Sequence, residues 1–173
     1  MCGFAGIASS SNDGYIDQTL IGRMTDGLFH RGPDDHGYYF DSDIGMGFRR
    51  LSIIDLDSGH QPMSNEDGTI WICFNGEIYN FQILRSRLRS LGHHFKTESD
   101  TEVIVHAYEQ WGIEATEHLN GMFSIALWDS VQRKLLLFRD RMGVKPVYWM
   151  AMENCLIFAS EVKSILKHPG VER

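Results

Sequence analysis

The chain begins with Met1-Cys2, and this pair is the first candidate for chemistry. Cysteine is small enough for the preceding methionine to be removed, which would leave Cys2 with both a thiol and a free α-amine. An α-amine titrates near pH 8 and a thiol at about 8.5, so the amine can serve as general base for its own side chain. A Met-Cys start alone is more often just a small residue opening an edge strand. With suitable partners, it indicates nucleophilic attack on a carbonyl carbon.

Asn75-Gly76 is the candidate oxyanion-binding pair. An attacked amide needs hydrogen-bond donors fixed where negative charge develops. The Asn75 side-chain amide and the Gly76 backbone N–H could both donate, and glycine allows close backbone approach and a positive φ. Asn-Gly is also the commonest hairpin dipeptide. Here a predicted helix follows the predicted strand over 69–75, which weakens the hairpin interpretation.

Three charged residues could hold the two ends of an amino acid. Arg50 ends a predicted strand and could bind a carboxylate through its planar guanidinium. Asp100, at a predicted helix start, and Glu77 could accept hydrogen bonds from an ammonium. Each also has a structural interpretation: a surface ion pair for Arg50, a complement to the helix dipole for Asp100, and a solvated charge for Glu77.

The elements that must position these residues follow from hydrophobic spacing. Helices are predicted over 16–29, after an N-cap at Asn80, from the capping box Ser99–Glu102, and over 161–166. Strands are predicted over 2–8, 37–40, 44–54, 69–75, 122–128, 135–139, 146–150 and 156–159. This order lacks the regular alternation of a parallel sheet, so we expect an α+β domain of antiparallel sheets covered by helices.

Composition narrows the functional classes. The chain has 173 residues, enough for one domain, and a net charge of −7 without a basic tract, which argues against nucleic acid or an anionic membrane as partner. The three cysteines have no CxxC spacing and the eight histidines lack zinc-site spacing, so no metal site is expected and a cytoplasmic location fits best. Neither a signal peptide nor a membrane span is predicted.

Nine sequence blocks occur in a characteristic order: MCGFAGI, HRGPDD, RRLSIIDL, QPM, FNGEIYN, SDTEVI, GMFSIALWD, RDRMGVKPVY and FASEVKSIL. In these blocks the chain strongly resembles the class II glutamine amidotransferase domain of the asparagine synthetase (glutamine-hydrolysing) family, an N-terminal nucleophile (Ntn) hydrolase. The resemblance implies a four-layer αββα sandwich of antiparallel sheets. It covers a glutaminase domain over 2–166, with 167–173 as the start of a linker.

The resemblance also implies residue roles. The nucleophile is Cys2, the oxyanion hole is formed by Asn75 and Gly76, and the substrate-binding residues are Arg50, Leu51, Ile53, Glu77 and Asp100. Leu51 and Ile53 contribute backbone contacts, and the glutaminase half needs no metal or organic cofactor. We expect a structural role for His30, and a tight loop without catalytic role for RDRMGVKP. Phe48 departs from the family, which often has histidine before the double arginine.

The implied partners are glutamine as substrate and a C-terminal synthetase domain that uses ATP and magnesium to activate an acceptor, aspartate or another carboxylate. The Gly-rich SGGLDS-type loop of that domain does not occur here, so we expect a fragment of a longer protein. A homodimer is left open. Two alternatives remain: a non-catalytic glutamine-binding module, which retained Met1 would favour, and an N-terminal-Cys hydrolase of other amides.

Overall fold

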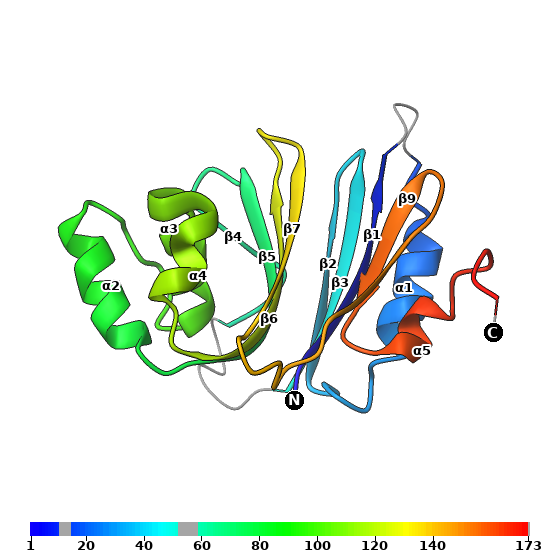
Figure 1. Cartoon of the computed structure of the whole chain (residues 1–173), viewed down its shortest axis with the longest axis horizontal. Helices are drawn as coiled ribbons and strands as arrows, with labels where there is room; N and C mark the ends of the chain where they lie inside the picture. The colour runs from blue at the N-terminus through cyan, green and yellow to red at the C-terminus, as the bar shows by residue number, and fades with distance from the viewer. Residues whose placement is uncertain (11–14, 52–58, 173) are drawn as a thin grey trace.

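The computed structural model describes residues 1–10, 15–51 and 59–172. Two antiparallel sheets face each other (Figure 1). The five-stranded sheet has the order β2-β3-β1-β9-β8, with bounds Asp35–Phe40, Ile44–Arg50, Gly3–Ser9, Cys155–Ala159 and Tyr148–Ala151. The four-stranded sheet has the order β4-β5-β6-β7, with bounds Met63–Ser64, Ile70–Ile78, Gly121–Asp129 and Lys134–Arg139.

Helices cover the outer face of each sheet, which confirms the expected four-layer αββα sandwich (Figure 1). The five-stranded sheet carries α1 (Gln18–Asp26) and α5 (Val162–Ile165). The four-stranded sheet carries α2 (Phe81–Ser90), α3 (Asp100–Trp111), the 3₁₀ turn η1 (Gly112–Glu114) and α4 (Ala115–His118). None of the helices within the described ranges is long and apolar enough to cross a membrane.

Strand alternation produces the apolar layer between the two sheets. Successive side chains of a strand point to opposite faces, so every second residue of a strand contributes to this layer. The buried side chains that form it are Phe4, Ile44, Met46, Phe48, Cys73, Ala126, Trp128 and Phe158. Each sheet also has one further buried apolar cluster, which lies between the sheet and its helices. The space between the sheets therefore has an apolar centre whose ends are free to carry polar residues.

The predicted strand over 69–75 was too short. β5 continues to Ile78 and pairs with β6 along its whole length, from Ile70 opposite Asp129 to Ile78 opposite Gly121. Asn75-Gly76 therefore lies inside a strand and not at its end or in a hairpin turn. The local sequence could not predict this long pairing, because β6 is more than forty residues further along the chain.

Two predicted caps are only partly confirmed. Asn80 stands at the N-cap of α2, but its side chain makes no capping bond and instead joins His118 and Asn120 through their backbone groups. Ser99 does cap α3 by accepting from the Glu102 N–H. The Glu102 carboxylate, however, accepts from the N–H groups before Ser99, at positions 96 and 97.

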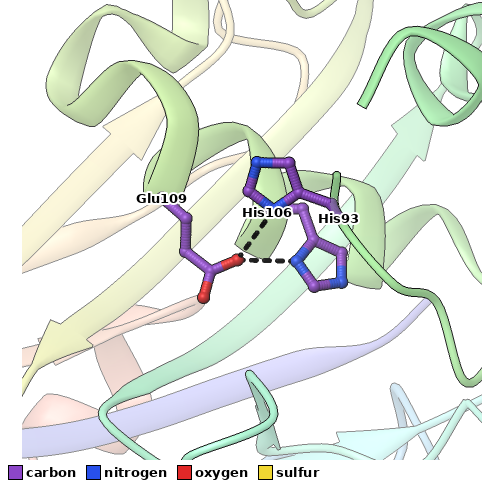
Figure 2. A group of neighbouring side chains, drawn as sticks. All are labelled: His93, His106 and Glu109. Carbon is purple, nitrogen blue, oxygen red and sulfur yellow. Dashed lines mark hydrogen bonds and ion pairs between the residues drawn. The ribbon is translucent and has the colours of Figure 1, made fainter. Parts of the chain in front are cut away.

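A charged cluster around the buried His106 fastens α3 to the loop that precedes it (Figure 2). His106 is 1% exposed, and its Nδ1 lies 2.6 Å from Glu109 Oε2, while His93 Nδ1 lies 3.3 Å from the same oxygen. Burial lowers the pKa of His106, but the ion pair with Glu102 at 3.8 Å and the hydrogen bond with Glu109 outweigh it and raise the pKa to about 9. Ligands of a tetrahedral zinc ion are separated by about 3.3 Å. The shorter 2.6 Å contact is that of a hydrogen-bonded ion pair, so we interpret the cluster as structural.

Candidate active site

Cys2 and Arg50 lie at the same end of the inter-sheet layer. Cys2 comes two positions before Phe4, and Arg50 comes two positions after Phe48; both phenylalanines are buried between the sheets. Because β1 and β3 pair with Gly3 opposite Arg49, these two ends lie side by side. The same alternation that builds the core therefore directs both functional side chains to the space between the sheets.

β5 supplies two further polar side chains by the same rule. Cys73 belongs to the inter-sheet layer, so Asn75 and Glu77, two and four positions later, share its face. Asp100 comes from the first turn of α3, and its Oδ2 accepts a hydrogen bond of 3.0 Å from the Ile78 N–H at the end of β5. This bond brings the helix start to the polar end of the strand.

These ends enclose a cavity of about 200 Å³. The predicted site residues that line it are Cys2, Arg50, Leu51, Asn75, Gly76, Glu77 and Asp100. Ile53 lies outside the described residues. Every predicted site residue that the structure describes is thus brought to one cavity, although these residues come from four separate parts of the sequence.

The nucleophile candidate is held through its backbone and its sulfur. The Leu51 N–H donates to Cys2 Sγ at 3.5 Å, and the thiol lies 3.7 Å from the Leu51 carbonyl oxygen. Arg31 Nε donates to the Cys2 carbonyl at 2.8 Å, and Arg31 Nη1 pairs with Glu161 Oε1 at 2.9 Å. Burial raises the pKa of Glu161, but hydrogen bonds from Arg31, Lys163 and His30 lower it to about 2.

Arg31 was not predicted as a site residue, although the HRGPD block contained it. Its side chain is 8% exposed and connects Cys2 to the residue before α5. The ring of His30 contacts Glu161 and Lys163 rather than Cys2. That position fits the structural role expected for His30.

Asn75 has the buried donor that an oxyanion would need. Its Nδ2 is buried and has no hydrogen-bond partner among the described residues. Ser124 lies directly opposite Asn75 on β6, and its buried hydroxyl also has no hydrogen-bond partner among the described residues. A buried polar group left unpaired costs about 1–3 kcal/mol, so a native protein has reason to keep one at a binding site.

Gly76 is required by close packing and not by its backbone conformation. A Cβ at this position would lie 2.2 Å from the Met122 carbonyl oxygen and 2.7 Å from Phe123 Cα, both on β6. Glycine at this position therefore allows β5 and β6 to pair closely. Its freedom to adopt a positive φ is not used, since Gly76 is not among the glycines with that conformation.

Glu77 and Asp100 place two carboxylates in the same cavity, where a cationic ligand would complete the site. Burial and, to a smaller extent, the negative charge of Glu77 raise the pKa of Asp100 to about 6, against the opposing effect of backbone hydrogen bonds. Two carboxylates placed together in a partly dry site are relieved by a cation. An ammonium group is a suitable ligand because its three N–H donors can serve both residues.

Two other cavity residues were missed. Gln61, in the QPM block, accepts from the Phe74 N–H at 2.6 Å and donates to Thr101 Oγ1 at 3.3 Å, so it links β5 to the start of α3. Lys145 belongs to the RDRMGVKP loop, for which no functional role was expected, yet it lines the cavity together with Cys2. Both residues belong to the sequence blocks of the family resemblance, but their place in the cavity depends on the fold.

The remaining cysteines and the Phe48 departure have structural explanations. Cys73 is buried between the sheets, and burial raises the pKa of its thiol well above the usual range. Burial also raises the pKa of Cys155. Phe48 packs in the same apolar layer, so the residue at this position fills the core and the substitution leaves the cavity lining unchanged.

Comparison with known proteins identifies the family. The family described as "Glutamine amidotransferase domain" matches residues 1–173. The chain belongs to this family. Among curated amidotransferase relatives, it is 48% identical to asparagine synthetase [glutamine-hydrolyzing] 2 of Bacillus subtilis (strain 168), over 100% of this chain and 23% of that protein. It is 40% identical to asparagine synthetase [glutamine-hydrolyzing] 2 of Arabidopsis thaliana, over 95% of this chain and 28% of that protein.

Solved structures confirm the fold of this amidotransferase domain. A glutamine phosphoribosylpyrophosphate (PRPP) amidotransferase from B. subtilis, complexed with ADP and GMP, matches with a TM-score of 0.74 and 20% identity, covering 94% of this chain and 42% of that one. The allosteric regulatory enzyme of purine biosynthesis matches with a TM-score of 0.76 and 20% identity, covering 95% and 43%. The chain spans about a quarter of the length of its curated relatives.

Proposed function

We propose that this domain hydrolyses glutamine to glutamate and ammonia through a thioester on Cys2, after Met1 has been removed. The observation that carries the proposal is the buried Asn75 Nδ2, which has no hydrogen-bond partner among the described residues and belongs to the cavity that also holds the Cys2 thiol. Removal of Met1 is necessary because the Cys2 nitrogen is otherwise an amide without basicity. Family membership and the names of the relatives support glutamine as the substrate.

The cavity matches glutamine group by group. Arg50 binds the α-carboxylate, Glu77 and Asp100 bind the α-ammonium, and the side-chain amide then extends toward Cys2. Binding the ammonium offsets one of the two negative charges of the carboxylate pair and relieves their repulsion. The backbone of Leu51, which contacts the Cys2 sulfur, and that of Ile53 complete the substrate contacts.

The reaction then needs only groups of this chain. The α-amine of Cys2 takes the thiol proton, and the sulfur attacks the amide carbon. The oxyanion accepts hydrogen bonds from Asn75 Nδ2 and the Gly76 N–H, and each such donor contributes roughly a hundredfold or more in rate. The α-ammonium protonates the departing nitrogen, which leaves as ammonia. Water, deprotonated by the same amine, hydrolyses the thioester, and the proton returns to the sulfur as glutamate leaves.

In the full protein we propose that the ammonia reaches a C-terminal synthetase domain that activates aspartate, or another carboxylate, with ATP and magnesium. The names of the curated relatives and their roughly fourfold greater length support this arrangement. The chain end at 167–173 would then be the start of the linker. A cytoplasmic location and, in the full protein, a homodimer are part of the same proposal. The glutaminase half itself should need no metal or cofactor, so it should keep its activity in EDTA.

The deciding experiment is labelling with an electrophilic glutamine analogue, followed by intact-mass measurement and peptide mapping. We expect a chain without Met1, a single adduct on Cys2, and protection by excess glutamine. Cys2→Ala should take up no label, while Cys155→Ser, which removes a half-buried thiol elsewhere, should label normally. Retained Met1, or label on Cys73 or Cys155 that glutamine does not prevent, would refute the proposal in favour of a binding module. Hydrolysis of amides without an α-carboxylate would refute the role of Arg50.

A further inference from the structure

We propose that Lys145 is a positioning residue that keeps the α-amine of Cys2 in its free-base form, ready to accept the thiol proton. The inference rests on the proposed glutaminase function and adds a role for the loop between β7 and β8. The geometry that points to it is a nearly buried ammonium placed at the N-terminal nucleophile.

Lys145 is 8% exposed and lines the same cavity as Cys2. Its Nζ lies 3.1 Å from the sulfur of Met1, a thioether that accepts hydrogen bonds only weakly. Within the part of the chain that the structure describes, no carboxylate forms an ion pair with this ammonium. Burying a charge without a counter-charge is costly, so a lysine kept in this position calls for a functional explanation.

The loop that carries Lys145 is built to hold it there. The buried Asp140 carboxylate accepts from the N–H groups of Val144, Lys145 and Phe123, at 2.9, 2.9 and 3.1 Å. Gly143 turns the chain with a φ of 66°. The Asp140 carboxylate thus binds backbone donors and fixes the loop to β6, and it is not a partner of the Lys145 ammonium.

Removal of Met1 would change what this ammonium faces. The sulfur beside Nζ leaves with Met1, and a new amine appears at the Cys2 nitrogen in the same cavity. A cation near an amine disfavours its protonation. For two generic charges about 6 Å apart, at effective dielectric constants of about 20 to 80, such an effect amounts to about 0.5–2 pH units.

The other charged groups around Cys2 do not replace this effect. They are Arg31, which is paired with Glu161, and the cavity residues Arg50, Glu77 and Asp100. In the proposed complex the carboxylate of glutamine pairs with Arg50, and its single ammonium lies between Glu77 and Asp100, offsetting one of their two negative charges. Lys145 is then the cation of the described cavity lining that has no carboxylate paired with it, so it acts on the amine at the stage where the amine must accept a proton.

The test compares the Met1-free protein with Lys145→Met, which keeps the length and removes the charge, and Lys145→Arg, which keeps the charge. Lys134→Met, on the exposed start of β7, is the matched control. The first measurement is the pH titration of the Cys2 α-nitrogen signal in protein labelled with ¹⁵N-cysteine. It follows protonation at the amine nitrogen itself and does not depend on glutaminase activity.

We expect the amine of the wild type to titrate below the range of about 7.7–8.0 that is usual for an N-terminus. Lys145→Met should raise this midpoint by about one unit, lower kcat/KM for glutamine about tenfold on the acid side of the profile, and recover near pH 9. Lys145→Arg and Lys134→Met should stay within about twofold of wild type at every pH.

Three results would overturn the role of Lys145: a wild-type amine that titrates at or above the usual range, an unchanged midpoint in Lys145→Met, or a midpoint raised equally in Lys145→Arg. The first needs no variant, so a folding defect in Lys145→Met does not protect the inference. A wild-type protein that does not hydrolyse glutamine would instead overturn the proposed function, while the titration would still decide the position of Lys145.

Discussion

Replacing Asp100 with asparagine should stabilise the empty domain and weaken its hold on glutamine. The pKa of Asp100 is raised from 3.8 to about 6, chiefly by burial and also by the neighbouring Glu77. At 1.36 kcal/mol per unit, ionised Asp100 costs the folded state about 3 kcal/mol at neutral pH, as an upper limit. Asparagine has the same shape, and its Oδ1 can still accept from the Ile78 N–H. The variant therefore removes the charge and keeps the contact.

The sign of the pH dependence follows from the direction of the shift. Between pH 4 and 6 the folded protein holds a proton on Asp100 that the unfolded chain has released. The contribution of Asp100 to stability therefore falls as pH rises through this window and stays low above it. Asp100→Asn lacks this dependence. Its free energy of unfolding should match wild type near pH 4 and exceed it by about 1–3 kcal/mol at pH 8.

Urea unfolding at pH 4, 5, 6 and 8 would measure this difference, and glutamine hydrolysis would measure the functional cost. Loss of one charged partner of the ammonium should raise KM about tenfold or more. Asp67→Asn is the control, because exposed Asp67 has a pKa lowered by hydrogen bonds with Thr69, and its removal should not stabilise the protein at pH 8. If Asp100→Asn were destabilised at pH 8 with the wild-type pH slope, the reasoning about an unfavourable carboxylate pair would be wrong.

Three further predictions test other parts of the site and fold. Gly76→Ala places a Cβ 2.2 Å from a carbonyl oxygen of β6, so it should lower the free energy of unfolding by about 1–3 kcal/mol and abolish hydrolysis; normal activity would disprove the close approach. Arg31→Met removes the donor to the Cys2 carbonyl and should lower kcat about tenfold with little change in KM, measured by glutamate release. The raised pKa of His106 contributes stability that is complete below pH 6.5 and lost as pH rises toward 9, about 3 kcal/mol at most; His106→Gln should remove this slope in urea unfolding, and a persistent slope would refute it.

Much of the fold could be predicted because the local patterns agree with it. The segments that became β1, β6, β7 and β9 were predicted as strands within one residue of the observed bounds. The strand predicted over 44–54 was too long, since β3 ends at Arg50. The capping residue Ser99 placed the start of α3 correctly. These features depend on neighbours in sequence, where spacing and backbone preference are informative.

The long-range contacts could not be predicted in the same way. β5 runs past Asn75-Gly76 because β6 pairs with it over nine positions, and no local signal distinguishes a turn from a strand that continues. Gln61 and Lys145 reach the cavity from loops whose course depends on the completed sandwich. The sequence blocks showed that these two residues belong to the family pattern, but they did not show that the side chains line the cavity.

One regularity of the site was nevertheless present in the sequence. On β3 and β5 the face that carries Phe48 and Cys73 in the core carries Arg50 and Asn75 two residues later. A strand whose inward face changes from apolar to polar must either expose the polar residues or surround them with a cavity. When several strands make this change at the same end of a sandwich, their polar groups meet in one cavity. The charges and donors then describe that ligand: a carboxylate for Arg50, an ammonium for Asp100 and its neighbour Glu77, and an amide carbonyl for Asn75. The site is thus formed by the same inward-facing positions that build the core. Its chemistry is determined by the polar residues that occupy these positions at one end of the strands.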